Sequence, residues 1–291
     1  MSPPHATTVR FDGLPTPSTE IKRGISVPWN FDPKHFAIYK AAIDSGKIGW
    51  VFNWEMWKPL GLPPTVTYIP QCRTVKEVDQ VIPRITIYQS DDQTLHFMYF
   101  LRSTDIGGIR KRGFNEPCID TQASVSISEA VELWKEHILP LRYLFPSVQI
   151  GSPAIANGPH GLPWIISFIS DLGGIQASGI DHIVVHVYDT TFQGFREYVE
   201  EVYDAFGLPI WVTEFACATR DPKERVREEE VSEEQVLKFM RECVEFLEQA
   251  KYVERYAWYG AMDDVGNGVG RANGLQRGDQ LTKAGKLYVS L

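Results

Sequence analysis

The sequence predicts an α/β protein that folds as a single (β/α)₈ barrel, the TIM barrel. The chain has 291 residues, well above the usual domain size of about 100–150 residues but close to the roughly 250 residues of such a barrel. Short β-forming runs alternate with amphipathic helical stretches, which is typical of βα units around a parallel sheet. We find no domain linker. We therefore assign residues 1–20 to a flexible N-terminal segment and residues 21–291 to one barrel domain.

Eight short runs have the composition of buried parallel strands. Several are nearly continuous stretches of apolar β-formers, such as IVVHV at 183–187 and PIWVTEF at 209–215, and strands covered on both faces have this composition. In chain order, the expected strands are 23–28, 48–53, 65–70, 112–116, 148–152, 182–187, 209–214 and 255–260.

The first expected helices carry clear start and stop signals. Asp32 is an N-cap followed by Pro33 at the first helical position, and Gly46 ends that helix. Ser126 and Glu129 form a capping box. The apolar stripe of the helix that they open is Val131, Trp134, Ile138 and Leu141.

Two later helices show the same periodicity. The first carries Phe195, Val199, Val202 and Phe206. The second opens at a capping box made by Ser232 and Gln235. Its buried stripe is Val236, Phe239, Cys243 and Leu247. We interpret both stripes as core.

The segment 73–111 is ambiguous, because 85–89 and 95–101 fit either a hairpin or helices. A barrel needs a helix before its fourth strand, and Ser90 with Gln93 forms a capping box. We therefore expect a helix from residue 90. The charge-rich run 220–234 predicts a solvated loop.

Charge and composition exclude several classes of partner. The net charge is −8, which gives no electrostatic attraction for nucleic acid or anionic membranes. No apolar run reaches the roughly 18 residues that a membrane span needs. Residues 1–20 lack the apolar core of a signal peptide. We therefore expect no nucleic-acid or membrane partner and a monomer. Localisation stays open: secreted or cell-wall associated if a leader has been removed, and otherwise cytoplasmic.

The four cysteines are too few for a disulfide framework and form no CxxC pair. We expect buried free thiols. A disulfide bridge between Cys118 and Cys217 is conceivable, because each cysteine closely follows a glutamate, Glu116 or Glu214, at the end of an expected strand. We expect that this bridge is absent. The disulfide state of Cys72 and Cys243 stays open.

Two glutamates lie at the ends of expected strands. The fourth strand ends GFNEP, which places Glu116 at the rim after Asn115, and the seventh ends WVTEF, which places Glu214 at the same rim. Reactive groups of barrels stand at the carboxyl ends of strands. Cleavage of a glycosidic bond requires such a pair, one carboxylic acid for the leaving oxygen and one carboxylate for the anomeric carbon or a water. We expect Glu116 and Glu214 to be catalytic.

Aromatic and polar side chains around this rim suit a sugar, whose rings have apolar faces and hydroxyl edges. His182 starts a strand, so we expect it at the opposite end in a structural role. No second ligand stands at metal spacing from His186, so we expect no metal, and nothing predicts a cofactor. The expected sugar-binding residues are His186, Tyr188, Trp258, Trp54 and Trp29.

The ordered motifs resemble glycoside hydrolase family 128 (GH128), fungal and bacterial β-1,3-glucanases of clan A, from about residue 23 onward. The matching pieces are FNWEMWKP at 52–59, GFNEP at 113–117, WKEHILPLR at 134–142, GSPAIANGPHGLPW at 151–164, the stretch 186–216 and ERYAWYGAM at 254–262.

The resemblance implies a retaining β-1,3-glucanase acting on laminarin-type, fungal cell-wall glucan. Glu116 would be the acid/base, Glu214 the nucleophile, and Asn115 a partner of the sugar 2-hydroxyl or of the nucleophile. Retention predicts carboxyl groups about 5–5.5 Å apart.

The sequence departs from the family pattern at the rim. After NEP the family has an acidic residue and a Gly-Gln step, whereas here Cys118, Ile119, Asp120 and Thr121 precede Gln122, which we keep in the substrate-binding set. The third strand ends YIPQCR. Endo or exo action stays open. Two alternatives also stay open: a β-glucan-binding protein with weak or no catalysis, and a clan A glycanase acting on β-1,4-linked polysaccharide.

Overall fold

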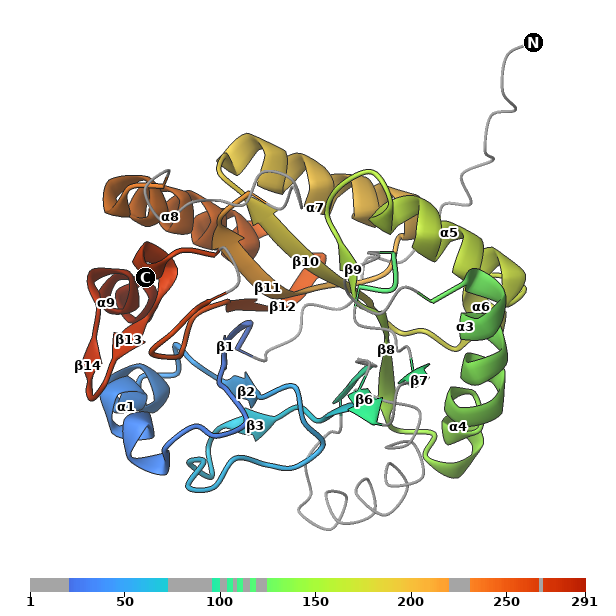
Figure 1. Cartoon of the computed structure of the whole chain (residues 1–291), viewed down its shortest axis with the longest axis horizontal. Helices are drawn as coiled ribbons and strands as arrows, with labels where there is room; N and C mark the ends of the chain where they lie inside the picture. The colour runs from blue at the N-terminus through green and yellow to red at the C-terminus, as the bar shows by residue number, and fades with distance from the viewer. Residues whose placement is uncertain are drawn as a thin grey trace.

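Parallel strands form a closed ring with helices around it (Figure 1). The structure is a computed structural model, and it describes residues 21–72, 96–99, 104–106, 109–111, 116–118, 125–219, 231–266 and 269–291. Of residues 72, 96–99, 104–106 and 109–111 it describes the backbone only. The expected N-terminal segment, residues 1–20, lies outside the described residues.

The ring has eight strand positions, and every pairing around it is parallel. The third and fifth positions are each held by two short strands in succession, and a bridge from Gly151 to His182 joins the fifth to the sixth. The strands in ring order are β1 (Arg23–Ser26), β2 (Trp50–Phe52), β3 (Thr67–Tyr68) with β4 (Gln71–Cys72), β5 (His96–Tyr99), β8 (Gln149–Pro153) with β9 (Ile155–Ala156), β10 (Ile183–Asp189), β11 (Ile210–Cys217) and β12 (Val253–Trp258). β12 pairs with β1 and closes the barrel.

Helices cover the outside of this ring (Figure 1). Two short antiparallel hairpins accompany them: β6 (Thr104–Ile106) with β7 (Ile109–Lys111), and β13 (Gln276–Arg277) with β14 (Gln280–Leu281). The helices are η1 (Pro33–His35), α1 (Phe36–Asp44), α3 (Ile127–Leu133), η2 (Trp134–Ile138), α4 (Leu141–Leu144), α5 (Gly161–Asp171), α6 (Ile175–Ser178), α7 (Phe192–Phe206), α8 (Glu233–Gln249), η3 (Arg271–Asn273) and α9 (Lys283–Ser290).

The expected barrel is confirmed, and seven of the eight expected strands coincide with strands of the ring. The fourth strand position differs. It is held by β5, which pairs with β4 and β8, so the helix expected from residue 90 is wrong at residues 96–99. Residues 112–115 lie outside the described residues, and Glu116 is in a turn. Pairing with two neighbouring strands selects the extended conformation at residues 96–99, because tertiary context often decides such short runs.

The predicted helix caps and stripes form. Asp32 caps the first turn by accepting from the Lys34 N–H, and Ser126 accepts from the Glu129 N–H. Ser232 and Gln235 make the complete reciprocal capping box of α8. Every residue of the three predicted stripes is buried. The helix after Ser126 contains a π-helical turn at η2, which its sequence pattern did not indicate.

Two apolar clusters stabilise the barrel, one between the strands and the helices and one inside the ring. The inner cluster comprises Trp50, Phe52, Ile69, Ala154, Val184, Trp211 and Ala257. At the amino ends of the strands, His182 stacks on Trp211 with ring centroids 3.9 Å apart, and Arg255 lies 5.0 Å from the same ring. His182 is therefore a packing residue remote from the rim carboxylates, as its place at a strand start predicts.

Cys217 and Cys243 are buried free thiols. Burial raises the pKa of Cys217 to about 12 and raises the pKa of Cys243 as well. Both thiols therefore stay protonated at neutral pH. The structure has no disulfide bridge between Cys118 and Cys217.

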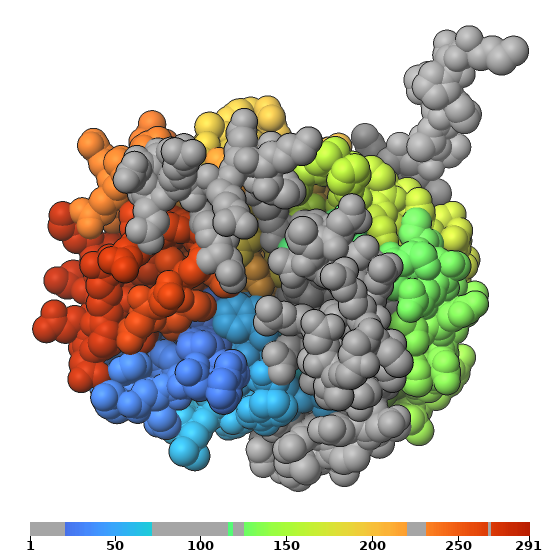
Figure 2. Space-filling model, in the orientation of Figure 1, coloured from blue at the N-terminus to red at the C-terminus, as the bar shows by residue number. Residues whose placement is uncertain are grey.

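The two ends of the barrel domain lie side by side, which the pairing of β1 with β12 requires (Figure 2). Arg23 reinforces this closure by donating to the Tyr256 hydroxyl and to the Tyr288 carbonyl of α9, both at 2.8 Å. Within the part of the chain that the structure describes, no helix has the length and apolar character that crossing a membrane demands.

Position 24 on β1 has to be glycine because the ring of Trp50 leaves no space for a side chain there. A Cβ at this position would lie 2.3 Å from Trp50 Cε2, and Trp50 is fully buried. We expect Gly24→Ala to lower the free energy of unfolding by about 1–3 kcal/mol, because overpacking displaces the indole. Denaturant unfolding followed by tryptophan fluorescence measures the change.

Gly274→Ala is the matched control for this substitution. Gly274 has φ −63°, and its nearest atom to a new Cβ lies at 3.4 Å, an ordinary contact. We expect a change within about 0.5 kcal/mol. Equal effects of the two substitutions would show that the close approach at Gly24 does not limit stability.

Candidate active site

Glu214 and His186 lie side by side on neighbouring strands at the rim of the barrel. The pairing of β10 with β11 places His186 opposite Glu214, and the register shifts between Val185 and His186. Such irregularities re-aim side chains near functional sites. His186 is fully buried, and Glu214 is 6% exposed.

Glu116 reaches the same place from a turn. Its backbone has φ 50°, in the left-handed region that non-glycine residues rarely adopt. Its N–H donates to the Ala154 carbonyl at 3.0 Å, which fixes it beside the junction of β8 and β9. Glu116 is 1% exposed. A locally strained conformation that the surrounding structure holds is typical of functional sites.

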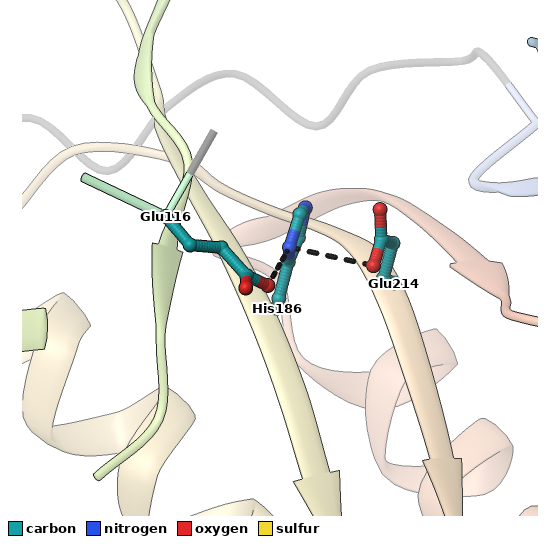
Figure 3. A group of neighbouring side chains, drawn as sticks. All are labelled: Glu116, His186 and Glu214. Atoms are coloured by element: carbon teal, nitrogen blue, oxygen red, sulfur yellow. Dashed lines mark hydrogen bonds and ion pairs between the residues drawn. The ribbon is translucent and has the colours of Figure 1, made fainter. Parts of the chain in front are cut away.

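The imidazole of His186 lies between the two carboxylates (Figure 3). Its Nδ1 is 2.7 Å from Glu116 Oε1 and 3.4 Å from Glu214 Oε2. One oxygen of each glutamate and one nitrogen of the histidine all lie within 4.8 Å of one another. The fold therefore brings the two predicted carboxyl groups together with a histidine that the sequence analysis assigned to sugar binding.

Both oxygens of Glu214 receive hydrogen bonds. The Trp54 indole N–H donates to Oε1 at 2.8 Å, and the Tyr188 hydroxyl donates to Oε2 at 2.7 Å. Trp54 has φ 58°, so it too is held in the left-handed region. These contacts fix the position and orientation of the Glu214 carboxylate.

Tyr259 is part of the site, although the sequence analysis did not select it. Its ring lies 5.8 Å from that of Trp54 and 5.9 Å from that of Tyr188, in edge-to-face contacts. It directly follows the last residue of β12. The signal was present as the pair Trp-Tyr at the end of the eighth strand.

Trp258, which we expected to bind sugar, does not line the site. It is fully buried, its indole N–H donates to the Asn273 carbonyl, and its ring packs on Phe215 and Phe239. Successive residues of a strand face opposite sides. Ala257 occupies the interior of the barrel, so Trp258 faces the helices.

The remaining expected residues are Trp29, Asn115 and Gln122. Trp29, in the segment after β1, is 69% exposed. Asn115 and Gln122 lie outside the described residues.

Chemically, the three central residues can transfer protons, attack an electrophilic carbon or hold a cation. Two carboxyl groups this close suit an acid and a nucleophile at one reacting centre. A carboxylate beside an imidazole suits proton exchange. The same oxygen and nitrogen atoms are also metal ligands.

Residues 27–288 match the family model "Glycosyl hydrolase catalytic core". The chain is also 29% identical over 245 residues to alkali-sensitive linkage protein 1 of Schizosaccharomyces pombe (strain 972 / ATCC 24843). That match covers 84% of this chain and 40% of the relative, so the chain spans less than half the length of that curated protein.

Solved structures share the fold. A curdlan-specific exo-β-1,3-glucanase of GH128 subgroup III from Blastomyces gilchristii superposes with a TM-score of 0.67 at 23% identity, covering 93% of this chain and 98% of that one. An endo-β-1,3-glucanase of subgroup II from Sorangium cellulosum gives 0.68 at 21% identity, with 92% and 98% covered. An exo-β-1,3-glucanase of subgroup VI from Aureobasidium namibiae gives 0.69 at 21% identity, with 94% and 97% covered.

A barrel with two buried carboxylates at one rim has the architecture of a glycoside hydrolase. The chain belongs to the glycosyl hydrolase catalytic core family, as the match over residues 27–288 shows. The fold expected from the resemblance to GH128 is confirmed by these structures, and the family match shows the catalytic core of a glycosyl hydrolase.

Proposed function

We propose that this protein is a retaining β-1,3-glucan hydrolase, with Glu116 as acid/base and Glu214 as nucleophile. The observation that carries the proposal is the short distance between the two buried carboxylates, one oxygen of each lying within 4.8 Å of the other. Inverting enzymes need about 6.5–9.5 Å to admit a water, whereas retaining enzymes hold their carboxyl groups about 5–5.5 Å apart.

The substrate class is supported by the solved relatives. All three GH128 structures compared above are described as β-1,3-glucanases. An Amycolatopsis mediterranei GH128 endo-β-1,3-glucanase that shares the fold is complexed with laminaritriose. Aromatic rings of Trp54 and Tyr259 at the site of this chain provide apolar surface of the kind that sugar faces contact. A polymeric glucan substrate favours a secreted or cell-wall location for this protein.

Glycosylation, in this proposal, begins with a protonated Glu116. Its proton passes to the glycosidic oxygen as that oxygen leaves, while a Glu214 oxygen attacks the anomeric carbon and forms a glycosyl ester. Glu116 is then a carboxylate and removes a proton from a water, whose oxygen attacks the same carbon and releases Glu214.

The neighbouring residues serve these two steps. His186 Nδ1, 2.7 Å from Glu116 Oε1, shares a hydrogen bond with the group that gains and loses the proton. Tyr188 and Trp54 hold Glu214 in line with the anomeric carbon through one hydrogen bond on each oxygen. Fixing the reacting groups in this way lowers the barrier by pre-arrangement.

The first test uses the substitutions Glu116→Gln and Glu214→Gln with laminari- and cello-oligosaccharides, analysed by product chromatography. We expect wild-type protein to cleave the laminari series selectively. Glu116→Gln should lower kcat by about 10²–10⁴-fold, the usual contribution of a general acid/base. Glu214→Gln should abolish turnover because no nucleophile remains. The exposed Glu201 of α7 gives the control Glu201→Gln, expected to match wild type.

Other outcomes of this experiment would select the alternatives. Oligosaccharide binding without turnover by wild type would make the protein a β-glucan-binding protein. Cleavage of cello- or manno-oligosaccharides but not laminari-oligosaccharides would make it a β-1,4-glycanase of the same clan.

The second test removes one hydrogen bond from Glu214 at a time. Tyr188→Phe keeps the ring and deletes the hydroxyl donor, and Trp54→Phe keeps an aromatic ring and deletes the indole N–H donor. A hydrogen bond to a charged group contributes about 1.5–3 kcal/mol, so we expect kcat/KM to fall about 10- to 100-fold in each variant. Steady-state kinetics on laminari-oligosaccharides measures this. Tyr143→Phe, at a residue 87% exposed, is the control. Unchanged kinetics in both variants would remove these donors from the mechanism.

The third test is the configuration of the first product. Double displacement retains the anomeric configuration. We therefore expect β-anomeric reducing ends to appear first in proton NMR spectra of a laminari-oligosaccharide digest, before mutarotation produces the α-anomer. Early accumulation of the α-anomer would contradict the nucleophilic role of Glu214.

A further inference from the structure

We propose that Glu116, His186 and Glu214 form a binding site for one divalent d-block cation of the Zn²⁺ type, which competes with sugar for the active site. The three residues offer two carboxylate oxygens and one imidazole nitrogen, all within 4.8 Å of one another. All three side chains are buried. The site follows from the side-chain geometry alone. Only its inhibitory consequence rests on the proposed glucanase function.

The two distances from His186 are close to those around a small cation, and the carboxylate oxygens of Glu116 and Glu214, within 4.8 Å of each other, have to approach to complete the site. Ligand bonds to zinc are about 2.0–2.2 Å, so two ligands of a tetrahedral site lie about 3.3–3.5 Å apart. His186 Nδ1 and Glu214 Oε2 are already 3.4 Å apart. The contact from His186 Nδ1 to Glu116 Oε1, at 2.7 Å, has to open by less than one ångström.

The donor set determines which cations fit. An imidazole nitrogen with two carboxylates favours zinc, copper, nickel or iron, whereas calcium and magnesium prefer oxygen ligands alone. Three protein ligands leave a fourth position for water, as in open zinc sites. We therefore expect Zn²⁺ to bind and Mg²⁺ to bind far more weakly.

Hydrogen bonds around the ligands support the site. Ligating carboxylates in metal sites are themselves held by further hydrogen bonds, and these orient them. Glu214 has this support from the Tyr188 hydroxyl on Oε2 and from the Trp54 indole on Oε1. The backbone N–H of Glu116 is bound to the Ala154 carbonyl, which fixes the position of the second carboxylate.

The negative charges of the two glutamates also favour a divalent cation at this site. A dication between two carboxylates, when both are ionised, neutralises charges that burial brings close together. Among the residues that the structure describes, this trio is the group of three or more histidine, cysteine, aspartate or glutamate side chains that meets the geometry of a metal site.

Binding of the cation has a direct consequence for hydrolysis. The metal bonds use the Glu116 oxygen, which handles the proton, and the Glu214 carboxylate, which attacks the sugar. Sugar and metal therefore exclude each other. If the proposed function holds, Zn²⁺ raises KM for laminari-oligosaccharides and leaves kcat unchanged.

Isothermal titration calorimetry of Zn²⁺ into the full chain, in a non-chelating buffer, tests the site without relying on turnover. We expect one saturable site in wild type. Tyr188→Phe removes a supporting hydrogen bond and should weaken zinc binding by roughly 10- to 100-fold. Glu116→Gln and Glu214→Gln each remove a ligand and should weaken zinc binding by more than this. Circular dichroism confirms that each variant is folded.

Two control variants address other donors. His35 Nε2 lies 3.1 Å from Asp279 at the surface, and Cys118 is a partly exposed thiol two residues from Glu116. His35→Asn and Cys118→Ser should both keep the wild-type zinc affinity. Loss of binding in either control, with binding retained in the two glutamate variants, would overturn the proposal.

The remaining outcomes also separate the site from the proposed function. Absence of saturable binding by wild type at millimolar zinc would refute the site, whatever the enzyme hydrolyses. Saturable binding that depends on both glutamates would support it even if no glucan is cleaved. A second measurement avoids variants: Mg²⁺ at the same concentration should give no comparable heat, and an equal response to both ions would contradict a site with a nitrogen ligand.

Discussion

Burial of two carboxylates beside one imidazole is the constraint on which the site depends. Removing an ionised group from water costs several kcal/mol unless it is paired or hydrogen-bonded. Glu116 and Glu214 are both nearly inaccessible to solvent, and His186 is within reach of both. Tyr188 and Trp54 each donate to Glu214. The donors around the pair are therefore a condition for its existence as well as for its chemistry.

The backbone around the site is unfavourable in isolation and is held by the barrel. Trp54 and Glu116 both have positive φ, and such conformations cost about 1–3 kcal/mol each. The strand carrying His186 is irregular in register at that residue. A closed ring of parallel strands, filled inside by Trp50, Phe52 and Trp211, is rigid enough to hold these residues in their unfavourable conformations. This rigidity allows the strands, and the turn that carries Glu116, to hold these side chains in fixed positions.

The sequence predicted most of the fold because buried strands and amphipathic stripes are local patterns. It could not predict β5, since a four-residue run has no period that separates strand from helix. The pair Glu116 and Glu214 could be predicted from the residues that end the expected strands, although Glu116 lies in a turn. Trp258 was assigned to the wrong face, because pleating decides by one residue whether a ring meets the site or the helices. The ring of Tyr259, the next residue, contacts Trp54 at the site instead.

The short distance between the two carboxylates suits the proposed hydrolysis and also the proposed binding of a metal ion. For the retaining mechanism proposed above, a short separation between the carboxyl groups favours direct attack by Glu214 on carbon. The same closeness, with His186 between the carboxylates, brings three donor atoms near the ligand spacing of a small cation. An enzyme of this geometry cannot exclude such a cation by distance alone. It can do so only through competition, since sugar in the site occupies the carboxylates, and through the cost of opening the short contact between His186 and Glu116. The proposed hydrolysis and the proposed affinity for a divalent metal therefore share one structural cause, the closeness of these three side chains.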